Sequence, residues 1–416
     1  MRRWLIALAA VLFAGPVAAR DGTLVIVGGA LSPDNDAVHA AFIEAARAHA
    51  GPGVAPRFLI IPAASGAPSD SARAFTAQLV RRGVEASQIA VSRVAVRDDE
   101  TTPEVDESRW TSGGLAPEEV AKATVADGIW FVGGDQARIV ATLKTTKGED
   151  TPLLTAIRRR LAEGAVIGGT SAGAAIMSEP MILQGDSLPA LLHPVGGSDT
   201  PDGEALALGR GLGFFPGVLV DQHFDRRARL GRLARATAVL PKAQRLGFGI
   251  DENTALVVDL SRRSARAIGA RGVTVLDARK AEIAARKSDF RLGQARLTVI
   301  SGGDRLDLTT LAVAPADNKR PVRVSRSASP RVRMAEGLAV PASRLDTWLA
   351  EDLVGVATAR RIERPSFVPG GRGVLYGFAR TPATAAYQGR DADGHDHDTI
   401  IDVAFDISPI QVVIKP

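Results

Sequence analysis

The sequence predicts an α/β protein in which a parallel sheet is covered by helices on both faces. Short apolar runs alternate with stretches of helical spacing from about residue 22 to residue 280. This alternation is typical of parallel strands, because each needs a crossover that packs back onto the sheet. Three runs end in glycine pairs, at Gly28–Gly29, Gly133–Gly134 and Gly168–Gly169. Ligands of such sheets bind beyond the carboxyl ends of the strands, so these pairs indicate the functional edge.

The predicted elements follow one another along the chain. Strands are expected at 24–29, 57–64, 89–94, 128–132 and 164–169, and helices at 34–50, 69–82 and 152–163. Ser69 or Asp70 is placed to cap the second helix. After a loop at 183–209 that is rich in Gly, Pro, Ser and Asp, we expect a strand at 217–220, a helix at 226–239 and a hairpin over 246–259.

The two ends of the chain differ from this central part. Residues 1–19 combine two early arginines, an apolar run and a small-residue cleavage site, which is the pattern of a signal peptide. We therefore expect residues 20–284 to form the catalytic domain of a secreted or periplasmic protein. Beyond residue 284, strand-like pieces appear without βα alternation, which predicts an accessory β-rich region at 285–416. The apolar run is too short for a stable membrane anchor.

Composition excludes several classes of site. The chain has no cysteine, so it can form neither a thiolate nucleophile nor a cysteine-ligated metal centre. Its formal net charge is only +5, and the basic residues are dispersed. The sequence therefore shows no clustered basic patch of the kind that binds nucleic acids.

The segment Gly169–Gly173 has the G-x-S-x-G pattern of a nucleophile on a sharp turn. It follows a predicted strand, and the residues after Ser171 can start a helix. Glycines on either side tolerate the close approach that exposes the hydroxyl, and free N–H groups of the following helix can stabilise an oxyanion. The turn therefore predicts a serine hydrolase with Ser171 as nucleophile.

A serine nucleophile needs a base, and the chain has six histidines. His223 is the best candidate because it follows the strand predicted at 217–220, at the expected edge of the sheet. Asp251 or Glu252, after the next apolar segment, can orient it. The chain order serine, histidine, acid disfavours the α/β-hydrolases, which share the elbow but place the acid before the histidine.

Four segments together resemble the cyanophycinase/peptidase E family of serine peptidases, and its cyanophycinase branch in particular. They lie at 132–136 (VGGDQ), 168–174 (GGTSAGA), 221–232 (DQHFDRRARLGR) and 249–255 (GIDENTA). The resemblance implies a class I glutamine amidotransferase-like fold, with Ser171 as nucleophile, His223 as base and Glu252 as the orienting acid. It also implies an oxyanion hole from the N–H groups of Gly134 and Ala172, with no cofactor and no metal.

The same resemblance implies a substrate. Cyanophycinases cut a polymer that has an aspartate backbone and arginine on each β-carboxyl group, and they release β-Asp-Arg dipeptides. Such a substrate needs charges of both signs in its pocket. The expected substrate-binding residues are therefore Arg227, Arg229 and Arg232 for carboxylates, with Gln136, Asp221 and Gln222 for amine or amide groups.

Two other functions remain open. One is a peptidase of the same family that acts on other acidic or isoaspartyl peptides, and the other is a non-catalytic binding protein with the same fold. The segment 391–398 (DADGHDHD) carries oxygen and imidazole groups but lacks calcium-loop spacing, so we expect a solvated turn. The predicted partner is a peptide or polymer substrate, with no nucleic acid and no stable membrane association. Whether the chain forms a homodimer is left open.

Overall fold

The computed structural model describes residues 21–196, 205–286, 289–329, 344–391 and 394–413. The predicted signal peptide lies outside the described residues. Within those ranges, no helix combines the length and the apolar character that crossing a bilayer requires.

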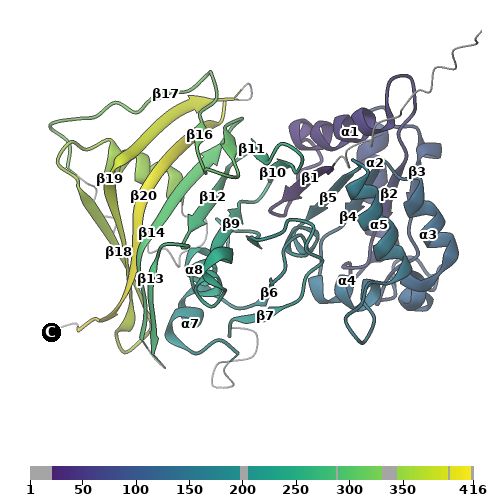
Figure 1. Ribbon diagram of the computed structural model, residues 1–416, viewed down its shortest axis with the longest axis horizontal. Coiled ribbons are helices and arrows are strands. Elements are labelled where there is room, and N and C mark those ends of the chain that lie inside the picture. The colour runs from purple at the N-terminus through teal and green to yellow at the C-terminus, as the bar shows by residue number, and fades with distance from the viewer. Residues whose placement is uncertain (1–20, 197–204, 287–288, 330–343, 392–393, 414–416) are drawn as a thin grey trace, which may run out of the picture.

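The described chain forms two large sheets that lie side by side (Figure 1). The first sheet has the order β16-β15-β11-β10-β1-β5-β4-β2-β3. Its strands are β1 (Thr23–Val27), β2 (Phe58–Ile61), β3 (Ile89–Val91), β4 (Gly128–Phe131), β5 (Val166–Thr170), β10 (Thr254–Asp259), β11 (Ser264–Gly269), β15 (Arg305–Asp307) and β16 (Val313–Ala314). The run from β1 to β3 is parallel, whereas β10 joins β1 antiparallel. This confirms the predicted parallel sheet.

Helices cover both faces of the parallel part, as predicted. They are α1 (Asp36–Ala50), α2 (Pro68–Arg81), α3 (Pro117–Thr124), α4 (Gln136–Leu143), α5 (Pro152–Ala162) and α6 (Ala172–Ala175), with the 3₁₀ turns η1 (Ala86–Gln88) and η2 (Glu107–Leu115). Alternate residues of β1 enter different cores: Leu24 and Ile26 pack with α4 and α5, while Val25 and Val27 pack with α1 and α2. Each strand is therefore apolar on both faces.

The second sheet has the order β17-β19-β20-β14-β12-β9-β8, with β13 on β14 and β18 on β19. Its strands are β8 (Leu219–Asp221), β9 (Leu246–Ile250), β12 (Gly272–Asp277), β13 (Glu282–Arg286), β14 (Asp289–Ser301), β17 (Arg320–Pro321), β18 (Arg361–Phe367), β19 (Arg372–Arg390) and β20 (Asp396–Gln411). The other elements are α7 (Ser187–Leu192), α8 (Leu230–Ala238), η3 (Lys242–Gln244), α9 (Leu345–Trp348), the π-turn η4 (Leu349–Val354) and a small sheet of β6 (Met181–Gln184) and β7 (Ala207–Gly209).

The region after residue 284 is rich in strands, as predicted, but those strands share a sheet with earlier ones. β14 pairs antiparallel with β12 on one side and with β20 on the other. The second sheet therefore continues across the predicted boundary at residue 284.

The predicted hairpin over 246–259 is wrong. β9 pairs with β8 and β12 in the second sheet, whereas β10 pairs with β1 and β11 in the first. The chain changes sheets at residues 251–253, where Asn253 has a φ of 53°. The Asn253 side-chain oxygen accepts hydrogen bonds from the Ser32 N–H and the Asn35 amide, both at 2.9 Å, which hold the turn against the first sheet. The sequence does not reveal that β9 and β10 belong to different sheets, because both are buried and both read as apolar runs that follow each other in the chain.

Two predicted helix starts also shift. α2 begins at Pro68 with Ala67 as the capping residue, so neither Ser69 nor Asp70 caps it. Proline suits the first helical turn because it has no N–H to satisfy there. α8 begins at Leu230 rather than at 226, since the preceding residues form a turn in which Ala228 has a φ of 49°.

Candidate active site

Ser171 stands between β5 and α6 in a strained conformation. Its φ is 54° and its ψ is −108°, a region that residues with a side chain rarely adopt. The turn is tight enough that a Cβ on Gly169 would lie 2.5 Å from the carbonyl oxygen of Gly173. The glycines of the G-x-S-x-G pattern are thus needed for close packing of the backbone, and the hydroxyl projects from the carboxyl end of β5.

His223 meets Ser171 from the other sheet. It follows β8, and its Nε2 lies 2.8 Å from Ser171 Oγ. The His223 N–H donates to the Gly28 carbonyl at 2.6 Å, and a Cβ on Gly29 would lie 2.3 Å from the imidazole. The glycine pair at the end of β1 therefore makes room for the imidazole. The sequence placed His223 at the edge of the same sheet as Ser171; the structure corrects this, because the site lies where the two sheets meet.

Glu252, rather than Asp251, faces the imidazole. Glu252 Oε1 lies 2.6 Å from His223 Nδ1. An ionised carboxylate only accepts hydrogen bonds, so Nδ1 carries the proton and Nε2 is free to accept one from Ser171. Asp251 instead accepts from the Gly272 N–H at 3.2 Å, and its burial together with nearby Asp225 raises its pKa well above the usual value.

Burial also lowers the pKa of His223 below its usual 6.5, although the hydrogen bond to Glu252 opposes the shift. Arg227, whose side chain is exposed, lowers the pKa of His223 further by charge repulsion. The imidazole is therefore neutral at pH 7. Neutral imidazole is the form that can take a proton from a serine hydroxyl.

Gly133 and Gly134, after β4, lie next to the serine. A Cβ on Gly133 would be 3.3 Å from the Ser171 Cβ. Gly134 has a φ of 143°, and a Cβ there would lie 2.1 Å from the Ala64 carbonyl oxygen. Only glycine fits this position. Gly133 thus borders Ser171, Gly134 follows it in the same loop, and Ala172 begins α6 directly after the serine.

Asp221, Arg229 and Arg232 form a buried ion cluster, which corrects their predicted role as direct substrate ligands. Arg232 donates to Asp221 through Nε at 2.9 Å and Nη2 at 2.5 Å, and Arg229 lies 3.6 Å from the same carboxylate. All three side chains are at most 6% exposed. The one carboxylate holds both guanidinium groups, and Arg229 also donates to the Gln222 carbonyl, so the cluster supports the turn that carries His223.

Gln222 and Gln136 are also engaged within the protein. The Gln222 side-chain and main-chain oxygens accept from Arg229 Nη1 at 2.6 and 2.5 Å. The Gln136 amide donates to the carbonyls of Ile182 and Leu183 in β6, at 3.2 and 2.5 Å. Of the predicted substrate ligands, Arg227 alone combines an exposed side chain with a position beside His223.

Asp225, for which the sequence predicted no role, contacts the backbone of Glu252. Its Oδ1 accepts from the Glu252 N–H at 3.1 Å, and its Oδ2 lies 3.2 Å from Arg271 Nε. It therefore holds the backbone of Glu252. Asp225 lies two residues after His223 in the segment 221–232, which resembles the family. This position was the sequence feature that could indicate a role for Asp225.

In the acidic segment at 391–398, Asp391 makes backbone hydrogen bonds with Gly394 and His395, and residues from Asp396 onward belong to β20. Asp391 Oδ2 lies 3.1 Å from His395 Nδ1 and 3.0 Å from His397 Nε2. Partial burial raises the pKa of Asp391, but hydrogen bonds from both histidines outweigh it and lower that pKa to about 2. Residues 392 and 393 lie outside the described ranges. Among the described residues, no group of three or more His, Asp or Glu side chains is arranged to hold a metal ion.

The chain is similar to known peptidases. The sequence model of Peptidase family S51 matches residues 24–265. A cyanophycinase of Synechococcus elongatus is 36% identical over 199 residues, which are 46% of this chain and 56% of that relative. A cyanophycinase of Trichormus variabilis is 35% identical over 203 residues, covering 47% and 62%. The matches thus span less than two thirds of these relatives. A crystal structure of a peptidase from an acI-B1 Actinobacterium is 22% identical with a TM-score of 0.43, covering 62% of this chain and 91% of that one.

Proposed function

Because the chain belongs to peptidase family S51, a family of serine-type peptidases, we propose that it hydrolyses cyanophycin or a similar aspartate-based polymer and releases β-Asp-Arg dipeptides. The observation that carries this proposal is the continuous contact from Ser171 Oγ to His223 Nε2 at 2.8 Å and from His223 Nδ1 to Glu252 Oε1 at 2.6 Å.

In the proposed first step, Ser171 Oγ attacks a peptide carbonyl carbon while its proton passes to His223 Nε2. The N–H groups of Gly134 and Ala172 stabilise the oxyanion of the tetrahedral intermediate. His223 then gives the proton to the leaving amine, and the C–N bond breaks to leave an acyl-enzyme. His223 then takes a proton from a water molecule that attacks the ester carbonyl. The C–O bond to Ser171 breaks, and His223 returns the proton to Ser171 Oγ.

Glu252 acts on His223 in two ways in this mechanism. Its carboxylate fixes the tautomer with the proton on Nδ1, and its negative charge stabilises the imidazolium that forms during the attack. Asp225 holds the Glu252 backbone through the 3.1 Å hydrogen bond, so it is a positioning residue.

Arg227 is the side chain that we propose for binding a substrate carboxylate near the scissile bond. It is exposed, and its charge acts on His223. Arginine suits this role because its planar fork binds a carboxylate through two hydrogen bonds. Arg229 and Arg232 contribute by holding the turn that presents His223.

Two finer assignments belong to the same proposal. Ser171 follows the strand between β1 and β4 in a parallel sheet, which supports a class I glutamine amidotransferase-like arrangement. Export through a signal peptide at 1–19 rests on the sequence pattern of that segment.

One experiment tests the activity. The purified protein is incubated with cyanophycin and, separately, with unrelated isoaspartyl peptides, and the products are identified by mass. We expect β-Asp-Arg from cyanophycin and none from the Ser171→Ala variant. Cleavage of isoaspartyl peptides alone would establish the other peptidase function, and undiminished release by Ser171→Ala would overturn the nucleophile.

A further inference from the structure

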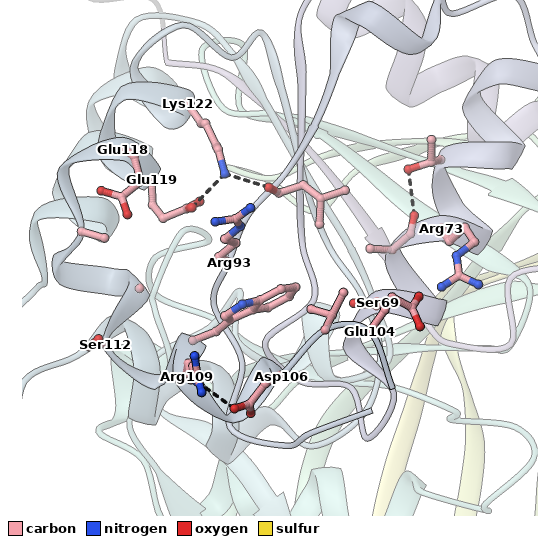
Figure 2. Close-up of a pocket in the computed structure, with 17 residues that line it drawn as sticks. Ser69, Arg73, Arg93, Glu104, Asp106, Arg109, Ser112, Glu118, Glu119 and Lys122 are labelled. Atoms are coloured by element: carbon pink, nitrogen blue, oxygen red, sulfur yellow. Dashed lines mark hydrogen bonds and ion pairs between the residues drawn. The ribbon is translucent and has the colours of Figure 1, made fainter. Parts of the chain in front are cut away.

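A large cleft lies beside β3, the edge strand of the first sheet. Its volume is about 950 Å³, and α2, β3, η2 and α3 contribute its walls (Figure 2). We name it the edge cleft. Ser171, His223 and Glu252 are not among the described residues that line it. β3 lies three strand positions from β5, so the cleft is separated from Ser171 by roughly 14 Å or more at ~4.8 Å per strand.

The edge cleft opens along the same edge of the sheet as the active site. Val91 is the last residue of β3, and Arg93 follows it beyond the strand's carboxyl end. The loop between β2 and α2 leads from one place to the other. The Ala64 carbonyl in that loop accepts from the Asp135 N–H at 2.9 Å, next to Gly134, and α2 then contributes Ser69 and Arg73 to the cleft. The two sites therefore lie along one edge of the sheet and are joined by this loop.

The cleft carries free charges of both signs. In the part of the chain that the structure describes, Arg73 and Arg93 make no side-chain hydrogen bond or ion pair, and the same holds for Glu104 and Glu118. All four side chains are exposed. In the view of Figure 2, Arg93 lies between Glu118 on one side and Arg73 with Glu104 on the other. Arg73 lowers the pKa of the buried Asp99 by its charge but makes no hydrogen bond or ion pair with it, so the donors and acceptors of all four side chains are available to a ligand.

The polar side chains at the floor of the cleft already have hydrogen-bond partners within the protein. Buried Glu119 accepts from Lys122 Nζ at 2.8 Å and from Ser92 Oγ at 2.9 Å. Trp110 is half-buried in the lining and adds a ring face, on which a guanidinium group can stack. The floor therefore keeps its shape while the charged groups on the rim remain free.

We propose that the edge cleft is a second substrate-binding site, which holds the uncleaved part of a polymer that carries carboxylate and guanidinium groups in equal number. Arg73 and Arg93 bind its carboxylates, and Glu104 and Glu118 bind its guanidinium groups. This inference rests on the proposed function. Binding at a second site keeps the shortened polymer near Ser171 after each dipeptide leaves, because rebinding at the active site is then intramolecular.

The test measures polymer binding in the Ser171→Ala background, in which the polymer is not cut. We compare sedimentation with insoluble cyanophycin for Arg73→Glu/Arg93→Glu and for Arg47→Glu/Arg57→Glu. The second pair is matched: both arginines are exposed and lie toward the opposite end of the strands, at the end of α1 and the start of β2, and both pairs lower the net charge equally. We expect binding to weaken about tenfold for the first pair, which corresponds to ~1.4 kcal/mol, and to remain unchanged for the second.

The variant Glu104→Lys/Glu118→Lys tests the need for both signs. Binding about tenfold weaker than the parent supports a mixed-charge ligand. Tighter binding would identify an attraction for anions only and would overturn the proposal, as would equal losses in the cleft variant and its control.

Kinetics separate this inference from the proposed function. In the active enzyme, Arg73→Glu/Arg93→Glu should raise KM for the polymer about tenfold and leave kcat unchanged. It should alter KM far less for a chain of two β-Asp-Arg units, whose backbone spans only ~7 Å, about half of the separation between the two sites. If Arg73→Glu/Arg93→Glu leaves KM for the polymer unchanged, the second site is overturned and the proposed function is not. Binding in the cleft without any cleavage would overturn the proposed function alone.

Discussion

His223 contacts Ser171 across the junction of two sheets: its Nε2 lies 2.8 Å from the serine Oγ, although one residue follows β8 of the second sheet and the other follows β5 of the first. The contact depends on the backbone at both positions, where φ is 54° for Ser171 and 48° for His223.

Glu252→Gln should lower kcat by about a thousandfold, because the amide neither fixes the His223 tautomer nor stabilises the imidazolium. Asp251→Asn is the matched control. Asp251 is the neighbouring acid, and it accepts from the Gly272 N–H instead of contacting the imidazole, a hydrogen bond that the oxygen of an Asn amide can still accept. We expect the control to retain activity within about threefold. Steady-state kinetics of both variants check this, and equal losses would remove the distinction between the two acids.

The activity should fall on the acid side with a midpoint below 6.5. Because His223 must be neutral to accept the serine proton and burial lowers its pKa, protonation inactivates the enzyme only below the usual histidine range. The hydrogen bond and charge of Glu252 raise the pKa of His223, so Glu252→Gln should move the midpoint to lower pH. The pH profile of kcat/KM measures both, and a midpoint above 6.5 would contradict the assignment.

Asp221→Ala should destabilise the fold by about 3–5 kcal/mol, because it leaves the buried guanidinium of Arg232 without its carboxylate partner. Urea unfolding measures this loss. Arg262→Ala removes an exposed arginine whose ion pair at 3.5 Å lies on the surface, and it should change stability by less than about 1 kcal/mol. A variant of Asp221 with full stability and only a raised KM would restore the role of direct substrate ligand.

Gly134→Ala should lower kcat by about a hundredfold or more, because a Cβ there would collide with the Ala64 carbonyl at 2.1 Å and displace the oxyanion-hole loop. Gly66→Ala, in the adjacent loop, is the control, since its Cβ would meet only Arg138 Nη1 at 3.8 Å. Steady-state kinetics and thermal unfolding of the two variants distinguish a loss of catalysis from a loss of fold stability. An active Gly134→Ala enzyme would exclude this loop from the oxyanion hole.

The family prediction from four short segments is confirmed by the match to Peptidase family S51 over residues 24–265. The parallel sheet and its two helical layers were also predictable, because buried strands and glycine turns leave local patterns. Export through residues 1–19 and the catalytic roles of individual residues stay predictions.

The sequence by itself determined the turn that presents Ser171, the choice of His223 among six histidines, and an acid at 251 or 252. Only the tertiary structure decided that Glu252 meets the imidazole, that β9 and β10 belong to different sheets, and that Arg229 and Arg232 are buried against Asp221. The physical reason is the range of the interactions. Turn chemistry and periodicity act within a few residues, whereas strand partners and the burial of a charge depend on segments far apart in the chain.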